Sequence, residues 1–245
     1  MRYLLSLLAL AALPACAQQR PPIVGVAHIG LKTNDMAAAR QFYGHVLGYQ
    51  EPFTLDKPSG GLMLTYFKVN DHQYIEVFPE LKSETEDRLS HIAFETTNIQ
   101  QLRDYLASRG VKVPDTLKPG LDGNLSMMLK DPDGHNVEFV EYRPGSLHSK
   151  NFGKFLPDTR VSKRIIHVGV TVQDRAAADR FYKDILGEDR RLGGIGVGEG
   201  AFFGRQHDAE GDEAEYGDRD QARHRPDELV MPDEHGEIMK EAFSQ

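Results

Sequence analysis

An internal repeat constrains the fold of this chain more than any single motif. The stretch His28–Gly48 aligns without gaps with His167–Gly187, and ten of the 21 positions are identical. Identities on this scale indicate that one supersecondary unit has been used more than once.

The first unit has the order of one strand, one helix and three further strands. Ile23–Lys32 alternates as a strand does, and Asn34-Asp35 precedes a helix predicted at Met36–Leu47 and closed by Gly48. Three strand-like runs follow, namely Tyr49–Leu55, Leu62–Val69 and Gln73–Phe78. This is a βαβββ module, which ends in the charged loop Pro79–Asp87.

The second unit repeats this order. A strand at Leu89–Thr96 is followed by Asn98, which caps a helix predicted at Ile99–Ser108. The remaining strands are predicted at Val111–Pro114, Asn124–Leu129 and Asn136–Tyr142, with a turn at Asp131–Gly134 between the last two. Residues 23–142 are thus predicted to form an α+β domain of two paired βαβββ modules.

A third unit begins and then stops. After a linker predicted at 143–162, residues 163–187 supply a strand at Ile165–Val172, a capping Asp174 and a helix at Arg175–Leu186. Residues 188–245 carry 16 acidic and 7 basic residues, and only 17 of these 58 residues are hydrophobic. Such a composition cannot bury enough apolar surface to offset the entropy of ordering, so it predicts a disordered acidic tail. A truncated, degenerate homologue is an alternative description of this end.

The N-terminus has the features of an export signal. Met1-Arg2 is basic, Tyr3–Leu13 is apolar, and small residues follow, which predicts a signal peptide at 1–17. Leu13–Cys16 also resembles a bacterial lipobox, which would make Cys16 a lipidation site. The expected location is the periplasm or, as a lipoprotein, the outer membrane of a bacterium. A membrane is expected as a partner only through the signal peptide or a lipid anchor.

Composition excludes several classes of function. The single cysteine excludes a disulfide scaffold and a cysteine-based zinc or iron–sulfur site. A net charge of −8 argues against nucleic acid as a partner, because phosphate contacts need a basic surface. No apolar run reaches the ~18–20 residues that span a bilayer.

Four polar residues lie at equivalent places in the two modules. Side chains alternate along a strand, so the bulky aliphatic residues of the first and last strand of each module face the helices. The opposite face then carries His28, Glu76, His91 and Glu138. The spacing is 48 residues in the first module and 47 in the second. Imidazole and carboxylate without thiol predict a site for one divalent metal, which is Zn, Ni, Co, Mn or Fe(II).

Weaker candidates would surround this cluster. The expected pocket residues are Tyr66, Tyr74, Phe78, Asn124 and Met128.

The motifs resemble those of the vicinal oxygen chelate superfamily, which includes glyoxalase I, methylmalonyl-CoA epimerase, bleomycin-resistance proteins and extradiol dioxygenases. The stretches that carry the resemblance are Val26–Gly30, Asp35 with Phe42-Tyr43 and Leu47-Gly48, Tyr74–Val77, Ser90–Phe94 and Asp131–Phe139. They cover residues 23–142 fully and 163–187 in part.

The resemblance implies a half-open barrel of mixed sheet with helices outside and a metal at its mouth. The metal would chelate two neighbouring oxygens of a small molecule, and Glu138, or by symmetry Glu76, would move a proton. An isomerase or lyase reaction is favoured over glyoxalase I itself, because glutathione is mainly cytosolic. Alternatives are an Fe(II) extradiol-type dioxygenase and a non-catalytic binding protein; formation of a homodimer is left open.

Overall fold

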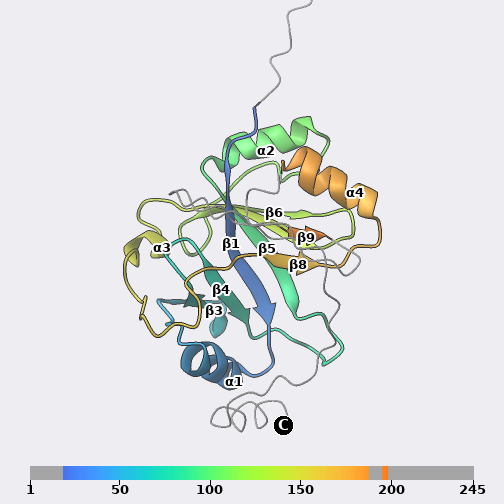
Figure 1. Cartoon of the computed structure of the whole chain (residues 1–245). Helices are drawn as coiled ribbons and strands as arrows, with labels where there is room; N and C mark the ends of the chain where they lie inside the picture. Colours follow the sequence, from blue (N-terminus) through green and yellow to red (C-terminus); the bar gives the residue numbers. More distant parts are fainter. Residues whose placement is uncertain (1–18, 188–194, 198–245) are drawn as a thin grey trace, which may run out of the picture. The chain divides into compact units, whose positions relative to one another are not determined.

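The computed structural model describes residues 19–187 and 195–197, and a curled, mixed sheet of seven strands forms its centre (Figure 1). The sheet strands are β1 (Ile23–Lys32), β2 (Thr54–Asp56), β3 (Leu62–Lys68), β4 (Tyr74–Phe78), β5 (Leu89–Thr96), β6 (Leu125–Lys130) and β7 (Asn136–Glu141). The order across the sheet is β2-β3-β4-β1-β5-β7-β6. The predicted α+β half-barrel is confirmed.

The two modules meet at the centre of this sheet. Within the modules, β1 runs parallel to β4 and β5 runs parallel to β7. The first strands of the modules, β1 and β5, pair antiparallel. The four strands predicted to carry the polar cluster are therefore neighbours, in the order β4-β1-β5-β7.

The aligned repeats fold alike down to an irregularity of the helix. In the first copy, Asp35 accepts a hydrogen bond from the Ala38 N–H (2.9 Å) and caps α1 (Met36–Arg40). The helix then continues as the π-helical segment η1 (Gln41–Val46). In the third copy, Asp174 caps α4 (Arg175–Asp179), and η2 (Arg180–Ile185) follows. The helices are as predicted, whereas their π-helical halves are a finding of the structure.

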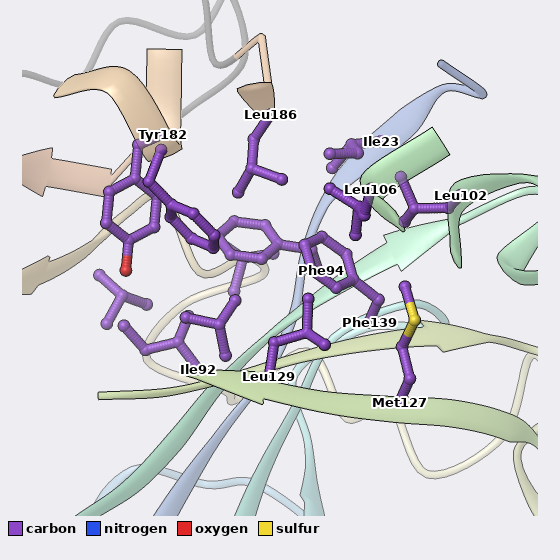
Figure 2. Close-up of a cluster of buried hydrophobic side chains, with 14 of the residues drawn as sticks. Ile23, Ile92, Phe94, Leu102, Leu106, Met127, Leu129, Phe139, Tyr182 and Leu186 are labelled. Carbon is purple, nitrogen blue, oxygen red and sulfur yellow. The ribbon is translucent and has the colours of Figure 1, made fainter. Parts of the chain in front are cut away.

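The apolar face of the sheet lies under the helices, as alternation along the strands predicts. Ile92, Phe94 and Phe139 are at most 1% exposed. They pack in one cluster with Leu102 and Leu106 of α2 (Ile99–Ser108), as Figure 2 shows. Burial of aromatic and aliphatic area on this scale supplies most of the stabilisation of such a layer. The opposite face of the same strands is left for the polar residues.

The partial third repeat packs into the same core. Phe181, Tyr182 and Leu186 are buried among the side chains of β5, β7 and α2, and Figure 2 shows Tyr182 and Leu186 beside that cluster. The Tyr105 hydroxyl of α2 donates to the Ile185 carbonyl (2.9 Å). The helix of the third repeat is thus fixed to α2 by apolar contacts and by a hydrogen bond.

A hydrogen bond to a buried carboxylate ties the third repeat to the β6–β7 turn. The Tyr182 hydroxyl donates to Asp131 Oδ2 (2.8 Å), which also faces His135 Nδ1 (2.8 Å). We expect Tyr182→Phe to lower the free energy of unfolding by about 1–2 kcal/mol, because a charge-assisted bond is lost while other donors remain. Urea unfolding measures this. An unchanged midpoint would show that the bond adds nothing to stability.

A short parallel pair follows the linker. Strand β8 (Val168–Val170) pairs with β9 (Ile195–Val197). The structure describes only these three β9 residues of the tail predicted at 188–245. The predicted signal peptide and Cys16 lie outside the described residues.

Of the strand predicted at Tyr49–Leu55, only the end is observed, in β2 (Thr54–Asp56). Another predicted strand is wrong. Val111–Pro114 forms no strand; the Val111 N–H donates to the Leu106 carbonyl, and the Pro114 carbonyl accepts from Arg103 Nε (2.6 Å). These bonds, and the missing N–H of Pro114, take the backbone groups that a strand would need. Conversely, the predicted linker contains a helical turn, α3 (Leu147–Lys150). No helix in the described part of the chain is long and apolar enough to cross a membrane.

Candidate metal centre

The four predicted ligands lie on one face of four adjacent strands. Strand register places Gly30 opposite both Glu76 and His91, so His28 is displaced from them by two residues along β1, which keeps it on the same face. Ala93 lies opposite both His28 and Glu138. The antiparallel meeting of the modules therefore brings the two histidines and two glutamates to the same region of the concave face.

Their donor atoms converge closely. His28 Nε2 lies 3.0 Å from His91 Nε2, 3.2 Å from Glu138 Oε2 and 3.4 Å from Glu76 Oε1. His91 Nε2 lies 3.2 Å from Glu138 Oε2 and 3.4 Å from Glu76 Oε2. The four side chains are largely buried, with exposed fractions of 5% for each histidine, 7% for Glu76 and 14% for Glu138.

The cluster is arranged to hold positive charge. Burial alone would lower the pKa of His91, but hydrogen bonds to Glu138 and Glu76 and the charges of these carboxylates raise it to about 9. Burial opposes ionisation of Glu138, yet hydrogen bonding to His28 and His91 holds its pKa well below the usual range. Two carboxylates in so buried a position require a compensating cation or proton.

The donor geometry fits a divalent metal. Ligand atoms ~2.1 Å from one metal, at tetrahedral or octahedral angles, are separated by about 3.0–3.4 Å. The distances between the donor atoms of the cluster, 3.0–3.4 Å, fall in this range. A group of three, His28, Glu76 and His91, could by itself hold an ion, with Glu138 beside it. Nitrogen and oxygen donors suit Zn, Ni, Co, Mn or Fe(II), and the set does not choose between them.

Gly30 makes room for one of these donors. A Cβ built on Gly30 would overlap the buried imidazole of His91 and come within 2.9 Å of its Nε2. The imidazole lies across β1 because the residue opposite it has no side chain. Gly30 occupies the same repeat position as Gly169, where a Cβ would meet nothing within 4 Å.

We therefore expect Gly30→Ala to weaken metal binding about 10–100-fold, the range for changes that misorient a ligand. Gly169→Ala is the matched control and should bind as the wild type does. Calorimetric titration with Zn²⁺ gives the affinities, and circular dichroism checks that both variants fold. Equal affinities for Gly30→Ala and Gly169→Ala would contradict the placement of His91.

A pocket of about 300 Å³ opens over the cluster. Its volume is at the lower end of the range for small-molecule sites. Four of the five expected pocket residues line it, namely Tyr66, Phe78, Asn124 and Met128. Tyr74 does not line the pocket. Its side chain is fully buried behind the lining residues, with its ring in edge contact with the rings of Tyr66 and His148.

Sequence reasoning missed part of the lining. His148 comes from α3, in the predicted linker, and Asp122 from the loop before β6. Tyr142, at the end of the predicted last strand, also lines the pocket. The only sequence signal for α3 is Ser146, whose hydroxyl caps the turn by accepting from the Ser149 N–H (3.1 Å).

Comparisons with known proteins agree with this architecture. Residues 25–139 match the family model described as the Glyoxalase/Bleomycin resistance protein/Dioxygenase superfamily. No curated protein sequence matches the chain significantly.

Among solved structures, the Mn(II)-bound glyoxalase from Novosphingobium aromaticivorans has a TM-score of 0.51 and 18% identity, covering 68% of this chain and 54% of its own. A hypothetical protein from Bacillus halodurans C-125 has a TM-score of 0.43 and 21% identity, covering 49% of this chain and 96% of its own. Methylmalonyl-CoA epimerase from Mycobacterium tuberculosis has a TM-score of 0.43 and 18% identity. The match covers 54% of this chain and 95% of the epimerase chain. At 18% identity, the likeness to the Mn(II)-bound glyoxalase concerns the fold alone.

Proposed function

Residues 25–139 belong to the glyoxalase/bleomycin resistance/dioxygenase superfamily, and from this premise we propose that the chain is a metal-dependent enzyme acting on a small molecule with two neighbouring oxygens. The favoured reaction is a proton transfer of the isomerase or lyase type. The observation that carries the proposal is the convergence of His28, Glu76, His91 and Glu138 at one buried point beside a pocket. A purely structural role would not require four ionisable groups there.

Three of the four residues would bind the metal ion, and the fourth would act as the general base. His28, Glu76 and His91 would hold the ion, which would supply Lewis acidity to polarise the substrate oxygens. Glu138 is the most exposed of the four side chains and lies outside the three-residue group. Its Oε2 would take the proton from the carbon beside a carbonyl, and return it to the neighbouring atom. Glu76, its symmetry-related partner, is the second candidate for this role.

Isotope exchange tests the proton transfer. The metal-loaded protein is incubated in D₂O with hydroxyacetone, dihydroxyacetone and short 2-hydroxy acids, and NMR follows deuterium at the carbon beside the oxygen pair. We expect exchange with at least one compound, and a loss of about 10²–10⁴-fold in Glu138→Gln at full metal occupancy. Exchange that is unchanged in Glu138→Gln would remove Glu138 from the role of base.

A second candidate function is supported by one observation. His28, Glu76 and His91 form a set of two histidines and one carboxylate, the donor set of non-haem Fe(II) oxygenases. Oxygen uptake by the Fe(II)-loaded protein in the presence of catechol would identify a ring-cleaving dioxygenase. Absence of uptake, with exchange in D₂O, would identify the isomerase or lyase class. Metal-loaded protein that does neither would favour a binding protein.

We further propose that the chain is exported. The proposal rests on the basic start, the apolar run Tyr3–Leu13 and the small residues before Gln18. Fractionation of a bacterial host, with palmitate labelling of wild type and Cys16→Ala, separates the outcomes. Label lost in the variant supports a lipoprotein, unlabelled periplasmic protein supports ordinary cleavage, and cytoplasmic protein of full length overturns export.

A further inference from the structure

A histidine from beyond the family-matched residues lines the same pocket as the metal cluster. His148 lies in α3, after the end of the match at residue 139. It is 3% exposed, and the rings of Phe53, Tyr66, Tyr74 and Tyr142 surround it at centroid distances of 4.6–5.1 Å. None of the functions assigned above uses this side chain.

Neighbouring hydrogen bonds determine which nitrogen of His148 carries the proton. The Arg143 N–H donates to Asn124 Oδ1 (2.9 Å), which fixes the orientation of the Asn124 amide. Asn124 Nδ2 then donates to Asp122 Oδ2 (2.6 Å) and lies 2.7 Å from His148 Nδ1. Asp122 Oδ2 also lies near Nδ1, but at 3.4 Å, so the shorter contact with the amide donor decides the tautomer. Two donors would repel each other at 2.7 Å, so Nδ1 accepts the hydrogen bond and Nε2 bears the proton.

The imidazole is neutral in this setting. Burial lowers the pKa of His148, and the nearby Asp122 carboxylate raises it by less. A neutral histidine with Nδ1 as acceptor presents a single donor, Nε2–H. That atom is buried and has no hydrogen-bond partner within the described part of the chain. A buried donor without an acceptor is costly, so its retention calls for an oxygen that it can meet.

The segment that carries His148 is held firmly in place. The Leu147 N–H donates to the Asp122 carbonyl (2.8 Å), at the start of α3. At the other end, the fully buried Lys68 donates to the Asn151 carbonyl (2.6 Å) and to Asp71 Oδ1 (2.6 Å). A donor fixed in this way loses little entropy when it binds a ligand.

The charge of the lining restricts what can enter. Carboxylates of Asp122, Glu76 and Glu138 line the pocket, and no lysine or arginine is among the described residues that do so. Apart from the oxygen pair at the metal centre, an anionic group on the ligand would meet repulsion without a compensating cation. An uncharged carbonyl or hydroxyl oxygen would not.

We propose that His148 Nε2–H donates a hydrogen bond to an uncharged oxygen of the substrate, remote from the oxygen pair that the metal cluster would hold. The inference rests on the proposed function, because it takes the pocket as the substrate site. It narrows the substrate class to small neutral molecules that have a third oxygen, as carbonyl or hydroxyl. His148 is thus a binding and positioning residue.

Three catechols of graded chemistry test this. Catechol has only the oxygen pair, 3,4-dihydroxyacetophenone adds a neutral carbonyl, and 3,4-dihydroxybenzoate adds a carboxylate. Binding to Zn²⁺-loaded full-length protein is measured by calorimetry for wild type, His148→Phe and His148→Gln. We expect the ketone to bind the wild type about tenfold more tightly than catechol, and the benzoate to gain nothing.

The variants separate the hydrogen bond from other effects. His148→Phe keeps an aromatic ring without the donor, so the preference for the ketone should disappear, whereas His148→Gln should retain part of it. A preference that persists in His148→Phe would reflect the acidity of the catechol and would overturn the role of His148. If all three compounds bind the wild type equally, the inference fails while the proposed function stands. If Zn²⁺ fails to bind, the proposed function fails, and the inference with it. If Zn²⁺ binds and none of the three catechols does, the inference is overturned while the metal centre stands.

Discussion

Replacing His28 by alanine is expected to weaken binding of a divalent metal by more than about 100-fold. Changes that only misorient a ligand already cost 10–100-fold, and here a ligand itself is removed. His28 Nε2 is within 3.4 Å of a donor atom of each of the other three residues, so no other side chain can replace it without moving the cluster. Calorimetric titration of the full chain with Zn²⁺ or Mn²⁺ measures the loss.

A second histidine provides the control for this variant. His72 also contacts a carboxylate, Glu95 Oε2 at 3.0 Å, but its side chain is 57% exposed and lies apart from the cluster. His72→Ala should bind metal as the wild type does. If the two variants lose affinity equally, the ion is bound through non-specific histidine contacts, and the assignment of His28 is wrong.

Replacing Phe181 by alanine is expected to lower the free energy of unfolding by about 3–5 kcal/mol, the usual cost of deleting a buried aromatic ring. Phe181 is 5% exposed and belongs to the same cluster as Phe94 and Phe139, although it lies outside the family-matched residues. The cost would show that the partial third repeat belongs to the core of the two-module domain. Urea unfolding followed by circular dichroism gives the value.

Phe152 is the matched control, because it is 60% exposed. Its replacement by alanine should change the free energy of unfolding by no more than about 0.5 kcal/mol. A loss below 1 kcal/mol in Phe181→Ala would mean that the third repeat packs on the domain without stabilising it.

The repeat made most of the fold predictable. Alternation and capping residues predict most of the strands and the helix of each module, because each unit buries one face and must place its apolar residues at regular intervals. The strand predicted at Val111–Pro114 is absent, because the Val111 N–H donates to a carbonyl of α2 and the Pro114 carbonyl accepts from the Arg103 side chain. The π-helical segments η1 and η2 could not be predicted either, because nothing in local propensity distinguishes them from a continuous α-helix.

The candidate site was predictable only where it follows the repeat. His28, Glu76, His91 and Glu138 occur at equivalent positions of known strand parity, so their convergence followed from the pairing of the modules. His148 has no counterpart in the repeat, and its place in the pocket depends on how the chain after β7 folds back. Tyr74 was expected to line the pocket but is buried behind its wall. The alternation of side chains along a strand shows which face a residue occupies, but not whether it reaches the pocket surface.

The metal content of the full-length protein tests the central claim most directly. The purified chain is stripped with a chelator, dialysed against Zn²⁺ or Mn²⁺, freed of unbound ion and analysed by plasma mass spectrometry. The four converging donors predict one tightly held divalent ion per chain in the wild type and none in His28→Ala. A wild-type protein that retains no more metal than His28→Ala would contradict the account.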